Sequence, residues 1–149
     1  MSVPARRPIP TLGGAVLRRR PVLAVRLTGP ADTKLRDGLL DSGADDTIFT
    51  KPLATLLGID LRRAEERLIA LAGRKGPVRC KYAPVQLRVT DGVSETYKWN
   101  AVVGFVAARL HYNLLGHAGF LEFFDVSFRG RPDYEAILTP KPSFPGTCV

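Results

Sequence analysis

The chain has 149 residues, of which 45% are hydrophobic and 24% charged, the composition of an ordinary globular domain. No apolar run approaches the length of a membrane-spanning helix, and no charged segment followed by an apolar stretch marks a signal peptide, so we expect no membrane association. The formal net charge is +8, but residues 1–20 hold five of the 22 basic residues and none of the 14 acidic ones, which leaves only +3 on the rest. The body of the protein is therefore not a basic platform for nucleic acid, and we do not expect nucleic acid as a partner.

The excess charge lies in an N-terminal arm, residues 1–19, that also contains Pro4, Pro8 and Pro10. Prolines interrupt a continuous amphipathic helix, which argues against a transit peptide. We expect a solvated or disordered arm, with a nucleic-acid contact as the less favoured alternative. Residues 20–139 form the expected domain, and the proline-rich residues 140–149 a loose C-terminal tail.

The first half of the domain consists of short extended runs separated by turns. Apolar residues alternate over 21–28, which is the period of a half-buried strand. Residues 29–32 are typical of a turn, after which 34–40 return as the partner strand. A short β-type run follows at 47–50.

A short helix is predicted next. Pro52 suits its first turn and Gly58 ends it. The residues expected to face inward are Leu53, Leu56 and Leu57. The charged residues 60–67 are expected on the surface.

A projecting β-hairpin is predicted from two extended runs, 68–71 and 78–90, that flank a glycine-bearing tip at 72–77. Taken alone, it is a plain solvent-exposed hairpin.

The second half continues the β pattern. A strand is expected over 95–106 with Trp99 and Val103 as apolar anchors, and residues 107–112 are ambiguous between loop and strand. The remaining predicted elements are one or two helical turns at 117–124 and strands at 125–128 and 134–138. Many short strands with regular turns and one or two short helices predict a mainly β domain, a closed barrel or a sandwich.

The stretch that organises the chain is Leu39–Phe49, in which an apolar run leads into an acid, a hydroxyl and a glycine. A carboxylate is costly to bury unless it is paired or changes its pKa. Asp41-Ser42-Gly43 is therefore either a turn, in which Asp and Ser bond their own backbone, or a chemical site, in which glycine lets a substrate approach.

The longer string Leu39–Ile48, LLDSGADDTI, resembles the catalytic loop of retropepsins, the retroviral-type aspartic proteases and their cellular and bacterial relatives. Arg20–Leu23, RPVL, resembles the start of the first core strand of that family. Asn113–Gly116, NLLG, resembles its later apolar element, which precedes a short helix. The resemblance covers roughly residues 20–130 and implies a retropepsin-like closed barrel or sandwich. The 68–90 hairpin would then be the flap, although Arg74 and Lys75 intrude into a tip that is usually rich in glycine.

Aspartic proteolysis uses two carboxylates that share one proton. No second Asp-[Ser/Thr]-Gly occurs in the sequence: Asp91-Gly92 lacks the hydroxyl residue, and Asp125-Val126-Ser127 lacks both the order and the glycine. The resemblance therefore implies a homodimer in which Asp41 of each chain meets at the two-fold axis. The implied activity is that of an aspartic endopeptidase acting on peptides or proteins.

The resemblance also assigns roles to single residues. Asp41 would be the catalytic acid, Ser42 would bond across the dimer to the partner loop, and Gly43 would bind the substrate backbone through its carbonyl. The residues expected to bind substrate are Leu39, Gly43, Ala44, Asp45, Asp46, Ala72, Gly73, Tyr112 and Leu114. Leu39, Tyr112 and Leu114 would form side-chain pockets with an apolar or aromatic preference.

Two alternatives stay open for these residues. Asp45 and Asp46 could form a merely solvated turn. Leu39, Leu114 and Leu115 could belong only to the core, which is the favoured reading for Leu115.

Two departures from the retroviral pattern affect the dimer. His117 stands where retroviral members usually have the arginine that pairs with Asp45, which predicts a weaker, pH-dependent tie. Arg20 remains where it can reach the partner's loop, which retains a dimer ion pair between Arg20 and Asp45. The chain also adds about twenty residues at each end, so residues 134–138 are expected to form the dimer sheet.

Other chemistries are less favoured. His111 and His117 are six residues apart and not near a cysteine pair with ligand spacing, so neither a metal nor a cofactor is expected. Ser42 lacks a histidine partner within the motif, and phosphate-binding glycine motifs are absent. Cys80 and Cys148 are interpreted as free thiols in a reducing compartment, hence a cytoplasmic location, with a disulfide as the alternative. The main rival to proteolysis is a retropepsin-like dimer that binds peptide or nucleic acid without cutting.

Overall fold

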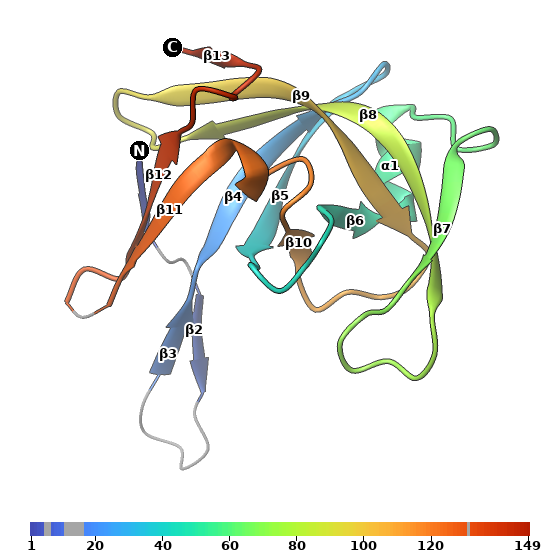
Figure 1. Ribbon diagram of the computed structural model, residues 1–149, viewed down its shortest axis with the longest axis horizontal. Coiled ribbons are helices and arrows are strands. Elements are labelled where there is room, and N and C mark those ends of the chain that lie inside the picture. Colours follow the sequence, from blue (N-terminus) through green and yellow to red (C-terminus); the bar gives the residue numbers. More distant parts are fainter. Residues whose placement is uncertain (5–6, 11–16, 131) are drawn as a thin grey trace.

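A closed barrel forms the body of the protein (Figure 1). The computed structural model describes residues 1–4, 7–10, 17–130 and 132–149. Within them, six strands form a closed ring in the order β9–β6–β10–β5–β4–β8 and back to β9. Their bounds are β4 (Val22–Thr28), β5 (Thr33–Leu40), β6 (Ile48–Thr50), β8 (Val78–Thr90), β9 (Thr96–Val106) and β10 (Asn113–Leu115). The mainly β, closed-barrel prediction is confirmed.

A parallel strand pair fixes where the central loop lies. β10 pairs parallel with β5, with Leu114 opposite Leu39 and Leu115 opposite Leu40. Gly38 makes this contact possible, because a Cβ there would lie only 2.7 Å from Leu115 Cγ. Leu115 is fully buried, so the core reading of this residue is confirmed.

The short helix α1 (Lys51–Leu57) has Pro52 in its first turn and ends at Gly58, which adopts a φ of 73°. Leu53 and Leu57, one turn apart, are buried against the barrel. Leu56 is 50% exposed, so the prediction that it faces inward is wrong. It lies about 100° around the helix from Leu57, outside the buried stripe.

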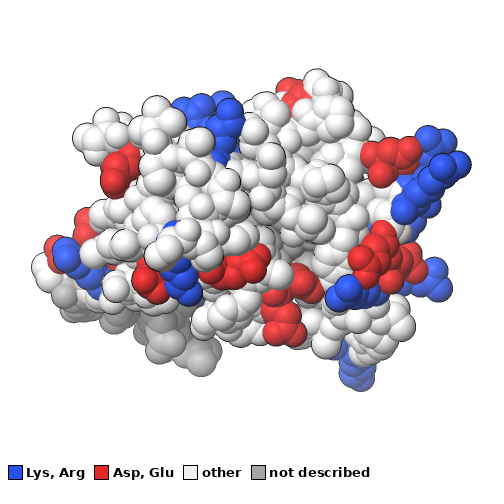
Figure 2. Space-filling model, turned by 45° about the horizontal axis from the view of Figure 1, so that its top comes forward, with Lys and Arg blue, Asp and Glu red and all other residues white. Residues whose placement is uncertain are grey.

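The hairpin expected at residues 68–90, for which the name flap hairpin is kept as a label, consists of β7 (Glu65–Ile69) and β8, joined by a tip in which Gly73 and Gly76 both have a φ of 78°. Residues 65–67, expected only to be surface, are exposed and also part of β7. Charged side chains of both signs lie next to one another at the right-hand end of the molecule in Figure 2. Within β7, Arg67 contacts Glu65 at 2.7 Å, and across the hairpin Arg79 of β8 contacts Glu66 of β7 at 3.8 Å.

A second sheet is formed by β1 (Ser2–Pro4), β12 (Glu135–Pro140) and β11 (Phe124–Arg129), in that order. Since β12 lies between two partners, both of its edges are paired. The outer strands of this sheet are β1 and β11, so a second chain would extend it through one of them, and the use of residues 134–138 in a dimer sheet stays a prediction. The helix expected at 117–124 is reduced to the 3₁₀ turn η1 (Leu121–Phe123).

The N-terminal arm is partly β-structure. Besides β1, a hairpin of β2 (Arg7–Pro10) and β3 (Leu17–Arg20) precedes the barrel. The described part of the arm is thus paired, contrary to the expectation, whereas 5–6 and 11–16 lie outside the described residues.

The C-terminal tail is also packed, which corrects the expectation of a loose segment. β13 (Thr147–Cys148) pairs with β9, and the Phe144 ring contacts the Trp99 ring at 5.6 Å between centroids. Trp99 also packs on Phe120 and Phe124 and donates to the Gly119 carbonyl oxygen. This aromatic cluster gives the tail a buried contact that its prolines did not reveal. None of the described helices is long and apolar enough to cross a membrane.

Candidate active site

Asp41 follows β5 directly and is held by its neighbours on the barrel. Its N–H donates to the Leu115 carbonyl oxygen at 3.1 Å, and its own carbonyl accepts from Ala44 at 3.2 Å. One carboxylate oxygen accepts from the Gly43 N–H at 2.9 Å. The side chain is half-buried, so the carboxylate is oriented by the turn and still reaches solvent. The turn and the chemical-site interpretations of this motif are therefore compatible.

The segment after β10 holds the Asp41 loop through backbone hydrogen bonds. The N–H groups of His117 and Ala118 donate to the carbonyls of Ala44 at 3.0 Å and Asp45 at 2.8 Å. Gly116 allows this close approach, because a Cβ there would lie 2.6 Å from the Ala44 carbonyl oxygen and would also collide with that of Asp46. The Asn-Leu-Leu-Gly element thus serves as the support of the Asp41 loop.

Thr47 anchors the end of the loop inside the protein. It is fully buried, and its hydroxyl donates to the Ala118 carbonyl oxygen at 2.8 Å. Its own carbonyl accepts from the Gly104 N–H at 2.8 Å. A buried hydroxyl with satisfied hydrogen bonds fixes the loop to β9.

The side chain of His117 bonds to the loop backbone. Its Nε2 lies 2.9 Å from the Ser42 carbonyl oxygen, which can only accept, so the imidazole is the donor. The predicted tie between His117 and Asp45 is not found: among the described residues, no hydrogen bond or ion pair reaches the exposed Asp45 carboxylate. The histidine side chain is shorter than the arginine of the retroviral pattern, and it bonds to the Ser42 carbonyl oxygen instead of the Asp45 carboxylate.

Asp46 is held by a residue that sequence reasoning missed. The Tyr82 hydroxyl, on β8, donates to the Asp46 carboxylate at 2.8 Å. Burial raises the pKa of Tyr82, and the hydrogen bond to Asp46 raises it further, so the hydroxyl stays protonated and remains a donor. The Arg67 guanidinium lies 5.7 Å from the centre of the Tyr82 ring. This chain of contacts links the Asp41 loop to the base of the flap.

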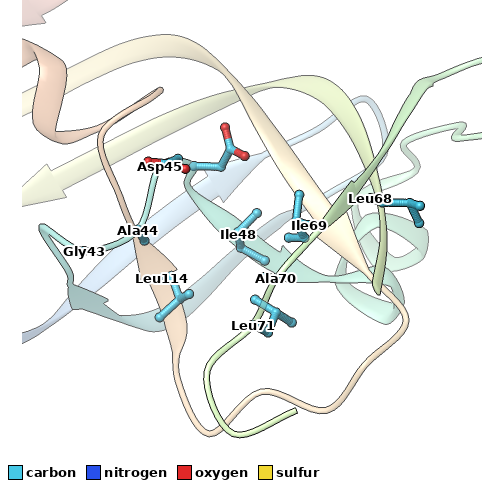
Figure 3. A pocket seen from close by; sticks show the side chains of 10 residues that line it. Gly43, Ala44, Asp45, Ile48, Leu68, Ile69, Ala70, Leu71 and Leu114 are labelled. Carbon is cyan, nitrogen blue, oxygen red and sulfur yellow. The ribbon is translucent and has the colours of Figure 1, made fainter. Parts of the chain in front are cut away.

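A cavity of about 280 Å³, here called the acidic cavity, lies between the loop and the flap (Figure 3). Its apolar side chains Ile48, Ile69, Leu71 and Leu114 point toward one another, while Asp45 lies at the edge. The cavity is lined by Gly43, Ala44, Asp45, Asp46, Ile48, Leu68, Ile69, Ala70, Leu71 and Leu114.

A second cavity of about 260 Å³, here called the basic cavity, contains Asp41. The Arg20 guanidinium lies 5.7 Å from the centre of the Tyr112 ring at this site. The cavity is lined by Arg20, Leu39, Asp41, Leu71, Ala72, Arg74, Arg109, Leu110, His111, Tyr112 and Leu114.

The structure thus groups most of the predicted residues around two adjoining cavities. Gly43, Ala44, Asp45 and Asp46 line the first, while Asp41, Leu39, Ala72, Tyr112 and Arg20 line the second. Leu114 lines both. Ser42 and Gly73 are exposed and line neither cavity in this single chain.

Neither cysteine forms a disulfide: Cys80 is buried and Cys148 is exposed. Burial raises the pKa of the Cys80 thiol. Within the described part of the chain, no group of three or more His, Cys, Asp and Glu side chains converges as around a metal ion.

Solved structures similar to this chain include two aspartic proteases. The crystal structure of a retropepsin-like aspartic protease from Rickettsia conorii matches with a TM-score of 0.49 and 26% identity, covering 78% of this chain and 89% of that one. EIAV protease, complexed with the inhibitor HBY-793, matches with a TM-score of 0.46 and 21% identity, covering 72% and 88%. This chain resembles retropepsin-like aspartic proteases in structure. No family model and no curated protein matches the sequence.

Sequence reasoning missed Tyr82, Thr47, Arg109 and the place of His111 at the site. Thr47 gave the one usable signal, a hydroxyl residue between the acid Asp46 and the apolar pair Ile48 and Phe49. Nothing in the local sequence marks Tyr82 or Arg109, because their roles depend on strands and loops far away in the chain.

Proposed function

We propose that the protein is an aspartic endopeptidase that works as a homodimer, with one Asp41 from each chain. The observation that carries this proposal is the placement of Asp41. Its carboxylate is half-buried, oriented by the Gly43 N–H, and lines a cavity to which the flap tip contributes Ala72 and Arg74. A peptide lying in that cavity would be covered by the flap and would touch the acid.

A second chain is required by the chemistry. Among the residues that line the basic cavity, Asp41 is the one carboxylate. Asp46 lines the other cavity and is bonded to Tyr82, so it does not supply the second acid. Two Asp41 side chains brought together by a two-fold axis would share a proton, since like charges about 3 Å apart do not both ionise.

The paired acids would divide the work. The ionised Asp41 takes a proton from a bound water, which attacks the carbonyl carbon of the peptide bond. The protonated Asp41 donates a hydrogen bond to the carbonyl oxygen and then helps to protonate the departing nitrogen. The exposed Ser42 hydroxyl would bond to the partner loop, and the Gly43 carbonyl to the substrate backbone. The proposal also includes the ion pair between Arg20 and the partner's Asp45, and a cytoplasmic location.

The experiment is cleavage of a diverse peptide library by the purified full chain between pH 4 and 7, read by mass spectrometry. We expect the wild type to cleave and Asp41→Asn to lose about a thousandfold in rate, because the carboxylate does acid–base work. Asp125→Asn, which alters an exposed acid on β11, is the matched control and should cleave like the wild type.

Circular dichroism and the oligomeric state of all three proteins show whether the loss is chemical. Equal cleavage by Asp41→Asn would overturn the assignment of the acid. A wild type that binds peptides as a dimer and never cuts them would favour the non-catalytic alternative.

A further inference from the structure

The basic cavity concentrates positive charge beside Asp41. Arg74 comes from the flap tip, Arg109 and His111 from the loop before β10, and Arg20 from the end of β3. These segments lie far apart in the sequence, so the fold brings the cations together. Against three arginines and a histidine the cavity holds one carboxylate, that of Asp41.

These cations lack the acidic partners that arginines have elsewhere on the molecule. At the opposite end of the flap, Arg62 contacts Asp60 at 2.7 Å, and Arg67 and Arg79 contact glutamates. Within the described residues, no ion pair joins Arg74 or Arg109 to an acid. Because these residues have no acid of their own, a carboxylate entering the cavity would meet unneutralised positive charge.

The apolar walls of the cavity favour the interaction of these cations with a bound carboxylate. Leu39, Leu71 and Leu114 line it between the cations, and Leu39 and Leu114 are half-buried. Arg74 and Arg109 are exposed, and apolar side chains beside them make an interaction between guanidinium and carboxylate stronger than it is in open water. Arginine also binds a carboxylate through two parallel hydrogen bonds, which adds geometric selectivity.

On the basis of the proposed function, we infer that the basic cavity receives an acidic side chain, aspartate or glutamate, from the substrate residue next to the scissile bond. Asp41 lines the same cavity, so a side chain held there belongs to a residue adjoining the bond that Asp41 attacks. This differs from the apolar preference expected from Leu39, Tyr112 and Leu114, which would instead contact the methylene groups of that side chain. A two-fold axis would place one such cavity on each side of the bond.

The negative charge of the Asp41 pair does not cancel the positive charge available to an acidic substrate side chain. The two Asp41 carboxylates share a proton and together carry a single negative charge. Arg20 is already assigned to the partner's Asp45, so the inference depends on Arg74 and Arg109. Each chain brings both of them.

The test uses peptides that differ only at the residues flanking one bond, which are glutamate, glutamine or leucine. Wild-type kcat/KM at pH 6.5 should be about fivefold higher for glutamate than for glutamine, the upper size expected for exposed charge pairs such as those of Arg74 and Arg109. The preference should shrink below about pH 4, where the glutamate itself is protonated, and in 1 M salt.

Arg109→Gln and, independently, Arg74→Gln should each remove most of the preference while still cleaving the glutamine peptide. Arg79→Gln on β8 is the matched control, because Arg79 lies outside the cavity and pairs with Glu66. Equal kcat/KM for all three peptides, or a preference that both cavity variants retain, would overturn the inference while the endopeptidase proposal stands.

Binding separates the two proposals if no peptide is cut. Fluorescence anisotropy of the same peptides, labelled, on the Asp41→Asn protein measures the cavity without catalysis. Tighter binding of the glutamate peptide that Arg109→Gln abolishes would support the inference even as the proposed enzymatic function fails. Equal binding of all three peptides would overturn it.

Discussion

The two cavities beside the Asp41 loop share Leu71 and Leu114 yet carry opposite charge. In the acidic cavity the charged groups are Asp45 and Asp46, which come from the loop itself. In the basic cavity the positive groups come from the flap tip, the loop before β10 and the end of β3. The acids are therefore part of one contiguous motif, whereas the bases are assembled only by the fold. A substrate lying across both cavities would meet a different charge on each side of the loop.

The Asp41 loop, which lies between the two cavities, should be displaced when one methyl group is added at Gly116. Gly116→Ala would drive a Cβ against the carbonyls of Ala44 and Asp46. We expect the free energy of unfolding to fall by about 1–3 kcal/mol, because such overpacking forces the backbone to move. Cleavage should be nearly lost, because the contact between Gly116 and the backbone of the Asp41 loop positions the residues that line both cavities.

Denaturant unfolding and peptide cleavage measure the two effects. Gly130→Ala is the control, because no heavy atom lies within 4 Å of a Cβ built there. A Gly116→Ala protein as stable and active as the control would show that the close contact of Gly116 with the Ala44 and Asp46 carbonyls does not hold the loop in place.

The acidic cavity alone is altered by Tyr82→Phe, which removes the hydrogen bond to Asp46. The free energy of unfolding should fall by about 1.5–3 kcal/mol, the usual size for a hydrogen bond to a charged group. Urea unfolding of a double-mutant cycle with Asp46→Asn isolates the bond. Strictly additive effects would mean that the two side chains do not interact in solution.

The same contact predicts an alkaline dependence. The folded-state pKa of Tyr82 lies above its ordinary value of 10.0 because of burial and the Asp46 bond. Its contribution to stability is therefore complete below about pH 10 and is lost as the pH rises beyond that value. Unfolding free energies measured from pH 8 to 11 should fall more steeply for the wild type than for Tyr82→Phe. Parallel curves would contradict the raised pKa.

The smallest effect is expected at the exposed edge of the acidic cavity. Asp45→Asn should raise KM about two- to fivefold for peptides with a lysine away from the scissile bond, because exposed charge pairs are worth under about 1 kcal/mol. The ratio of kcat/KM for glutamate over glutamine at the bond should not fall, because Asp45→Asn removes no cation from the basic cavity and only frees the partner's Arg20 from its proposed acid. A fall in that ratio as large as that of Arg109→Gln would show that the cavities are not separate.

Much of the fold could be predicted from the sequence because its signals are local. Alternating apolar residues predicted β4, the turn after it predicted the returning strand β5, and Pro52 with Gly58 bounded the helix. The failures involve distant partners. Phe144 packs the tail on Trp99, and β1 of the arm pairs with β12, neither of which the local pattern records.

The same division holds at the site. Asp41, Asp45 and Asp46 lie in one motif, so a resemblance could propose them. Tyr82 and Arg109 reach the site from β8 and from the loop before β10, and only the barrel closure brings them there. His117 occupied a position that the retroviral pattern assigns to an ion pair, and its shorter ring bonds the Ser42 carbonyl instead.

The most direct test of the central claim is subunit mixing. A fixed amount of wild-type protein is incubated with a ninefold excess of tagged Asp41→Asn protein until native mass spectrometry shows that subunits have exchanged. If each active site needs two Asp41 carboxylates, peptide cleavage should fall about tenfold, because few wild-type chains still pair with one another. Cleavage that stays constant while mixed dimers form, or a fully active protein that remains monomeric, would contradict a site built from two chains.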